Sequence, residues 1–167
     1  MTSKLIRSRK SSTRKLKPCE PSLINNPDIG FMKQALAMAT SHKGLTGENP
    51  SVGCVIVKQG RVLARAVTAE GGRPHAETQA LEIAGRQAKG ATAYVTLEPC
   101  SHHGQTGPCA KALIAAGISR CVIATIDPDP RVHWRGAALL QEAGIDTEVG
   151  CLAGEATAIM ADFFARF

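Results

Sequence analysis

The sequence predicts an α/β fold, a three-layer α/β/α sandwich around a mixed sheet of about five strands. Short apolar runs rich in β-branched residues recur along the chain, and segments with apolar residues at helical spacing lie between most of them. Glycine or proline marks most of the boundaries between these segments. The length of 167 residues suits one domain, which we place at residues 28–167.

The first half of this domain is predicted to contain a helix, a two-stranded hairpin and a second helix. Two apolar runs on either side of the turn formers Gln59 and Gly60 indicate the hairpin. A cap for the first helix can come from Asn26 or Asp28. The predicted ranges are 29–42, 52–57, 62–68 and 76–87.

The second half alternates strands and helices. Pro108 suits the first turn of a helix that ends near Gly117. In the last helix Ile159, Phe163 and Phe164 form an apolar side. That side is either ordinary core or a self-association face, so the sequence leaves a homo-oligomer open. The predicted strands are 91–97, 119–126 and 146–149, and the predicted helices are 108–117, 136–142 and 155–167.

The net charge of +6 comes from the N-terminus. Residues 1–17 contain seven Lys or Arg and no acid, whereas residues 18–167 hold 13 basic and 14 acidic residues and have a net charge of −1. Residues 1–27 are therefore expected to be a disordered basic tail and linker. The tail is either simply solvated, an Arg- and Ser-rich transit peptide, or a sequence-independent phosphate contact. The domain itself is not a basic surface, so nucleic acid is not the expected partner.

The cysteines and the hydropathy favour a cytoplasmic location, with organellar targeting by the tail as the alternative. Six cysteines in a chain of this length do not indicate a secreted disulfide framework. Cys54 and Cys121 lie in apolar strand-like runs and are expected to be core thiols. No apolar run approaches the roughly 18 residues of a membrane span, so no membrane association is expected.

Two short segments carry the candidate chemistry, a His-Ala-Glu segment that begins at His75 and a longer segment at 99–109. The side chains of His75, Cys100 and Cys109 make a three-ligand set for zinc, the number found in catalytic sites, where water is the fourth ligand. Zinc lowers the pKa of such a water towards ~7. Glu77 is close enough in sequence to carry its proton to a leaving group. A His-x-Glu segment followed by Pro-Cys is typical of zinc deaminases.

Two alternatives stay open for these residues. A closed structural zinc site would need a fourth protein ligand, and His102 or His103 could supply it. Cys100 and Cys109 could also be two unrelated buried thiols.

At these residues the chain resembles the deaminase domain of the bifunctional riboflavin-biosynthesis pyrimidine deaminase/reductase, which has the cytidine-deaminase-like fold. The similarity runs from about Phe31 to Phe167. The Ser-His-His-Gly sequence that follows Cys100 separates this family from the nucleoside and tRNA deaminases. The segments that carry the resemblance are 49–57, 74–77, 91–104 and 127–132.

The resemblance implies zinc as the cofactor and Glu77 as the catalytic proton carrier. It implies hydrolysis of 2,5-diamino-6-(ribosylamino)pyrimidin-4-one 5′-phosphate to 5-amino-6-(ribosylamino)uracil 5′-phosphate and ammonia. Gln105 stands where the family usually has Lys or Arg. From the residues alone, Asn49 could be only a turn former, and His102 could orient a neighbouring side chain. The implied substrate contacts are Asn49, the backbone at Ala76, His102, Gln105, Asp127 and Asp129.

Two other functions stay open. The chain could deaminate another nucleotide or an RNA base, or it could be a non-catalytic zinc-containing binding module. In the family, the last helix leads into a reductase domain. The chain ends at Phe167 and contains no G-x-G-x-x-G fingerprint. Reductase activity is therefore expected from another chain or from a missing domain.

Overall fold

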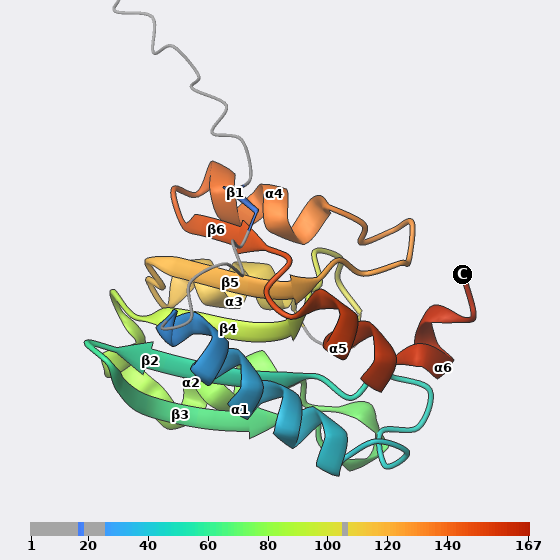
Figure 1. Cartoon of the computed structure of the whole chain (residues 1–167). Helices are drawn as coiled ribbons and strands as arrows, with labels where there is room; N and C mark the ends of the chain where they lie inside the picture. Colours follow the sequence, from blue (N-terminus) through green and yellow to red (C-terminus); the bar gives the residue numbers. More distant parts are fainter. Residues whose placement is uncertain (1–16, 19–25, 105–106) are drawn as a thin grey trace, which may run out of the picture.

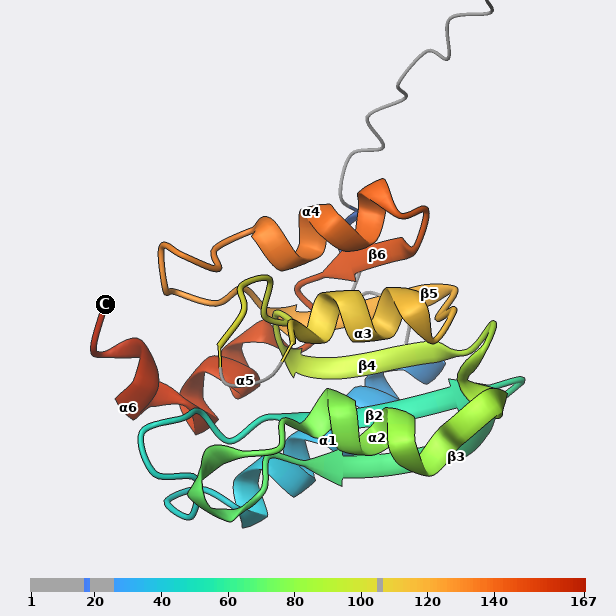
Figure 2. The same cartoon turned by 180° about the vertical axis from the view of Figure 1, so that it is seen from behind.

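The computed structural model describes residues 17–18, 26–104 and 107–167. These residues form one sheet with helices on both of its faces (Figure 1, Figure 2). The elements in chain order are β1 (Lys17–Pro18), α1 (Pro27–Ser41), β2 (Gly53–Lys58), β3 (Arg61–Val67), α2 (Ala76–Ala84), β4 (Thr92–Leu97), α3 (Cys109–Ala115), β5 (Arg120–Thr125), α4 (Arg135–Glu142), β6 (Asp146–Val149), α5 (Ala153–Ile159) and α6 (Ala161–Phe164). Apart from β1 and the start of α1, the predicted tail at 1–27 lies outside the described residues.

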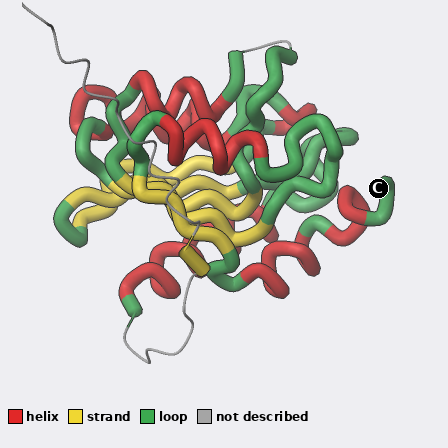
Figure 3. Tube along the Cα trace, turned by 90° about the horizontal axis from the view of Figure 1, so that it is seen from above, coloured by secondary structure: helices red, strands yellow, loops and turns green. Residues whose placement is uncertain are grey.

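The sheet is mixed, as predicted. Its strand order is β1-β6-β5-β4-β2-β3. Strands β4, β5 and β6 run parallel, whereas β2 is antiparallel to both β3 and β4. The two-residue β1 adds a sixth strand at the edge, parallel to β6. Helices α1 and α5 cover one face and α2, α3 and α4 the other, so the three-layer prediction is confirmed (Figure 3).

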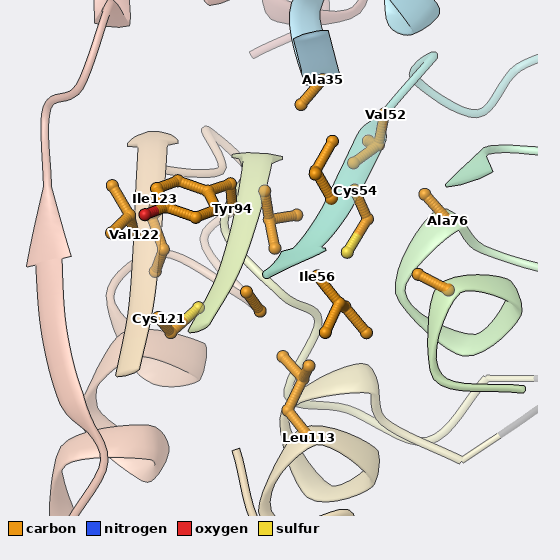
Figure 4. Packing of buried hydrophobic residues seen from close by; sticks show 14 of the residues in the cluster. Ala35, Val52, Cys54, Ile56, Ala76, Tyr94, Leu113, Cys121, Val122 and Ile123 are labelled. Carbon is orange, nitrogen blue, oxygen red and sulfur yellow. The ribbon is translucent and has the colours of Figure 1, made fainter. Parts of the chain in front are cut away.

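The core lies between the sheet and both helix layers. Figure 4 shows Ala35 of α1 on one side of the sheet and Leu113 of α3 on the other. Cys54 and Cys121 are fully buried in this apolar cluster, which confirms that they are core thiols. Gly53 allows α1 to lie directly on β2, because a Cβ atom there would be 2.0 Å from the carbonyl oxygen of Ala35. None of the helices in the described part of the chain is both long and apolar enough to span a bilayer.

Two predicted helices are shorter in the structure than in the sequence pattern. The helix predicted at 76–87 ends at Ala84 and continues as a 3₁₀ turn at Gly85–Ala88, because Gly85 adopts a positive φ of 53°. The single helix predicted at 155–167 is wrong. The chain breaks at Met160, with φ −101° and ψ 23°, into the short helices α5 and α6. Met160 itself is buried, and the chain changes direction after it.

A polar cluster ties the first turn of α1 to the sheet. The Asn26 side chain accepts a hydrogen bond from the Asp28 N–H, so Asn26 is the cap of α1. The Asp28 carboxylate accepts two bonds of 2.8 Å from the Arg120 guanidinium and one of 2.6 Å from the Tyr94 hydroxyl. Arg120 also donates to Glu148 on β6. The bonds from Arg120 hold the pKa of Asp28 below its usual value, although burial opposes this.

We expect Asp28→Asn to lower the free energy of unfolding at pH 7 by about 1–3 kcal/mol, because it removes one of the two carboxylates that bind the partly buried Arg120 guanidinium and leaves only the one of Glu148. The folded-state pKa of Asp28 lies below 3.8. The stabilisation is therefore present above that pH and is lost as the pH falls through the folded-state pKa. Urea unfolding followed by circular dichroism between pH 3 and pH 7 measures both effects.

The matched control is Asp162→Asn. The Asp162 side chain is 87% exposed and forms a long ion pair of 4.0 Å with Lys43. This substitution should change the unfolding free energy little. An Asp28→Asn variant as stable as the control at pH 7 would contradict the prediction.

Candidate metal centre and active-site cleft

Three side chains from different parts of the sequence meet at one end of the sheet. His75 immediately precedes α2, Cys100 follows β4, and Cys109 is the first residue of α3. The Nδ1 atom of His75 lies 3.4 Å from the Sγ atom of Cys109 and 3.9 Å from that of Cys100. The ligand atoms of all three residues lie within 4.8 Å of one another. This is the end at which the parallel strand β4 terminates, where ligands of open α/β sheets bind.

The spacing of these atoms fits zinc. Tetrahedral zinc with bonds of roughly 2.0–2.1 Å to nitrogen and 2.3 Å to sulfur places those two ligand atoms about 3.6 Å apart. The two observed distances lie on either side of this value. His75, Cys100 and Cys109 are therefore placed to bind a zinc ion. The cluster found among the described residues includes neither His102 nor His103, so it does not support the closed-site alternative. The alternative of two unrelated thiols is wrong.

The surroundings of Cys100 favour the ionised form that a metal requires, whereas the hydrogen bond to Cys100 and burial raise the pKa of the Cys109 thiol. The Cys109 backbone N–H donates to the Cys100 sulfur at 3.2 Å. The hydrogen bond from the Cys109 thiol lowers the pKa of Cys100 to about 4, with the bond from His75 acting in the same direction and burial opposing both. Because thiolates rather than thiols ligate zinc, Cys100 is prepared for this role before the metal binds.

Glu77 lies beside the cluster but is not one of its three members. It is the second residue of α2, is 4% exposed, and lines the same cleft as His75 and Cys100. Burial raises the pKa of Glu77 to about 7, against the lowering influence of His75. A carboxylate with a pKa in this range can both accept and release a proton at neutral pH.

The cleft in front of the cluster has a volume of about 280 Å³. Four of the predicted substrate contacts line it, namely Asn49, His102, Asp127 and Asp129. The Ala76 side chain belongs to the hydrophobic core, so a contact from this residue is limited to its backbone. Gln105 lies outside the described residues.

The turn after β5 holds two acidic side chains in different states. The Asp127 carboxylate accepts a 2.8 Å bond from the Asp129 N–H. Burial raises the pKa of Asp127 to about 6, and the Asp129 and Glu98 charges add to this. Asp129 forms an ion pair with Arg131, which lowers the pKa of Asp129. The Asp127 carboxyl therefore titrates near neutral pH, whereas the Asp129 carboxylate is ionised at that pH.

Sequence reasoning missed the role of Glu98. This side chain is 3% exposed and accepts hydrogen bonds from three backbone N–H groups, those of Asp127 at 3.3 Å, Trp134 at 3.0 Å and Ala137 at 3.0 Å. It thereby ties the turn after β5 and the start of α4 to the end of β4, two residues before Cys100. An acidic residue directly after an apolar strand was the only signal for this function in the sequence.

The loop before α4 is shaped by two unusual backbone positions. Trp134 adopts a left-handed conformation with φ 63°, which is uncommon for a residue with a side chain. At Gly136 a Cβ atom would lie 1.9 Å from the carbonyl oxygen of Pro99, so only glycine fits. This close approach sets α4 against the segment that carries Cys100.

Comparisons with known proteins agree with this site. The family described as the cytidine and deoxycytidylate deaminase zinc-binding region matches residues 25–125. The riboflavin biosynthesis protein RibD of Aquifex aeolicus is 47% identical over 142 residues, which cover 85% of this chain and 40% of that protein. The diaminohydroxyphosphoribosylamino-pyrimidine deaminase of Buchnera aphidicola subsp. Acyrthosiphon pisum is 44% identical, over 83% of this chain and 95% of that protein.

Solved structures lead to the same assignment. The structure of Acinetobacter baumannii RibD is similar with a TM-score of 0.78 and 44% identity, over 83% of this chain and 39% of that chain. This chain thus spans about 40% of the length of the RibD proteins that it matches. The fold is the cytidine-deaminase-like fold of these RibD structures. The family match and the extent of these identities show that the chain belongs to the zinc-binding cytidine and deoxycytidylate deaminase family.

Proposed function

We propose that the chain is a hydrolase that deaminates 2,5-diamino-6-(ribosylamino)pyrimidin-4-one 5′-phosphate. The products would be 5-amino-6-(ribosylamino)uracil 5′-phosphate and ammonia. The observation that carries the reaction type is the buried Glu77 beside a three-ligand zinc site in an open cleft. The substrate is supported by the name of the Buchnera relative, nearly all of which this chain matches.

The chain's own residues perform the proton transfers in this proposal. When bound by His75, Cys100 and Cys109, zinc supplies Lewis-acid chemistry and acidifies the reacting water. Glu77 accepts a proton from that water as its oxygen bonds to the amino-bearing ring carbon. It then delivers the proton to the amino nitrogen as the C–N bond breaks and ammonia leaves. Its pKa of about 7 suits both transfers.

Other residues of the cleft would hold the substrate. We propose that Asn49 and His102 donate hydrogen bonds to the ring or ribose. The carboxyl groups of Asp127 and Asp129 would accept bonds from ring amino groups or ribose hydroxyls. The backbone N–H groups at the start of α2, around Ala76, would contact the ring. These contacts would fix the ring carbon near the metal, which is worth several kcal/mol of activation free energy in well-oriented reactions.

A cytoplasmic location is supported by the free thiols of the described cysteines Cys54, Cys100, Cys109, Cys121 and Cys151. Self-association through the last helical segment stays a prediction.

The test is ammonia release by the purified, zinc-loaded protein. The expected result is turnover of the phosphorylated diaminopyrimidine and no turnover of cytidine, deoxycytidylate or adenosine in RNA. Ammonia release from one of those other compounds, without release from the diaminopyrimidine, would replace the proposed substrate. An absence of ammonia with every compound from a protein that holds one zinc ion per chain would support a binding module instead.

A further inference from the structure

The charges that line the cleft pose a problem for the proposed substrate, on which this inference rests. A phosphate monoester carries nearly two negative charges at pH 7. Among the residues that the structure describes, five acidic ones line the cleft. Repulsion between like charges at short range costs several kcal/mol in a partly desolvated site. A phosphate must therefore meet a cation at the point where it binds. The acidic residues are Glu48, Glu77, Glu98, Asp127 and Asp129.

Three arginines of the described part of the chain line the cleft, and two of them are poorly placed for this role. The Arg131 guanidinium is bonded through Nε to both carboxylate oxygens of Asp129 and through Nη2 to one of them, so most of its charge is compensated. Arg73 lies two residues before His75, and its Nη2 atom lies against Gly104. It therefore belongs to the metal end of the cleft, where the pyrimidine ring must react.

The third arginine, Arg166, follows α6 and is held in place by neutral groups. Its Nη1 donates a 2.6 Å hydrogen bond to the backbone carbonyl of Glu48. Its guanidinium carbon lies 6.0 Å from the centroid of the Phe163 ring. Among the described residues, no carboxylate lies within ion-pair distance of it. The Arg166 guanidinium is thus held in place, and no carboxylate of the described residues neutralises its charge.

The location of Arg166 matches the shape of the substrate. Figures 1 and 2 show α6 beyond the end of the sheet at which β4 and β5 terminate. Arg166 is exposed and lines the cleft, whereas Glu77 lies buried within it. The 5′-phosphate is at the opposite end of the substrate from the reacting ring, with the ribose between them. A ring held next to His75 and Glu77 therefore directs the phosphate outward to the rim.

We propose that Arg166 binds the 5′-phosphate of the substrate and makes the site selective for phosphorylated over unphosphorylated ribosides. One N–H of the guanidinium stays on the Glu48 carbonyl, and the other donors reach two phosphate oxygens. Such bidentate pairs are the geometry for which arginine is best suited. The segment after α5 is then part of the substrate site, although it follows the last strand of the fold.

The experiment compares Arg166→Gln, Arg166→Lys and a charge-matched control, Arg61→Gln. Arg61 is exposed and begins β3, whereas the cleft-lining Thr68 follows the other end of that strand. Loss of a charge-assisted hydrogen bond should raise the KM for the phosphorylated substrate in Arg166→Gln by roughly 10- to 100-fold. The KM for the unphosphorylated riboside should stay within a factor of about two, because the lost bond is to the phosphate. Arg166→Lys should recover part of the preference, and Arg61→Gln should behave as wild type.

A second measurement separates this inference from the proposed function. Ribose 5-phosphate binding to the zinc-loaded protein, measured by isothermal titration calorimetry, requires no turnover. Binding that weakens at least tenfold in Arg166→Gln supports the phosphate subsite even if the pyrimidine is not deaminated. Equal binding by wild type and Arg166→Gln, or no binding by the wild type, overturns the subsite. Deamination with an unchanged phosphate preference in Arg166→Gln also overturns it and leaves the proposed function standing.

Discussion

Glu77→Gln is expected to reduce kcat by roughly 10²- to 10⁴-fold, the usual contribution of general acid–base catalysis. Gln has nearly the same shape as Glu but can neither accept the proton of the attacking water nor return it to the departing amine. The KM should change much less than kcat, because the substrate contacts that we propose come from other residues. Stopped or coupled ammonia assays on the purified variant measure both constants.

Zinc content distinguishes this effect from damage to the metal site. Glu77 is not among the three clustered ligand residues, so Glu77→Gln should hold one zinc ion per chain by atomic absorption. Glu82→Gln is the matched control, because Glu82 lies on the same helix and is exposed. A Glu77→Gln variant with the turnover of Glu82→Gln would remove Glu77 from the mechanism.

Cys109→Ser is expected to lose zinc and, with it, all measurable deamination. Changes to residues that only support metal ligands already cost 10- to 100-fold in affinity, so removal of a ligand should weaken zinc binding by at least about 100-fold. The remaining pair, His75 and Cys100, offers fewer protein ligands than catalytic zinc sites use. Zinc content after dialysis against a weak chelator, and the spectrum of the cobalt-substituted protein, report the change directly.

Cys121→Ala provides the comparison for Cys109→Ser. Cys121 is a fully buried thiol on β5 that belongs to the hydrophobic core rather than to the metal cluster. It should keep one zinc ion per chain even if its stability falls, because core truncations act on packing. Full zinc occupancy in Cys109→Ser after dialysis would show that the cluster has been assigned incorrectly.

The metal cluster could be predicted from sequence because its chemistry is local. His75 and Glu77 lie at the start of one helix, and Cys100 and Cys109 flank one short segment. Side-chain type and short spacing limit what such residues can bind, and the structure places His75, Cys100 and Cys109 together. The hairpin and the parallel strands could be predicted for a similar reason, since turn formers and runs of β-branched residues act over a few positions.

Contacts between distant segments could not be predicted in this way. The three N–H groups that donate to the Glu98 carboxylate belong to residues that lie 29, 36 and 39 positions after it in the chain. The Arg166 guanidinium reaches the Glu48 carbonyl 118 positions away, and it does so after a helix break that the apolar pattern at 155–167 conceals. Asp28, a candidate cap by sequence, is instead the partner of Arg120.

By itself the sequence predicted the three metal ligands, proposed Glu77 as the proton carrier and located most of the strands, because each is marked by residue types in short motifs. Only the tertiary structure decided which charges share the cleft and how they are compensated. Arg131 and Arg166 both line the cleft, yet Arg131 is bonded to the Asp129 carboxylate and Arg166 to the backbone carbonyl of Glu48. The physical reason is that the charge available to a ligand depends on the partners that folding places around it, and these come from anywhere in the chain.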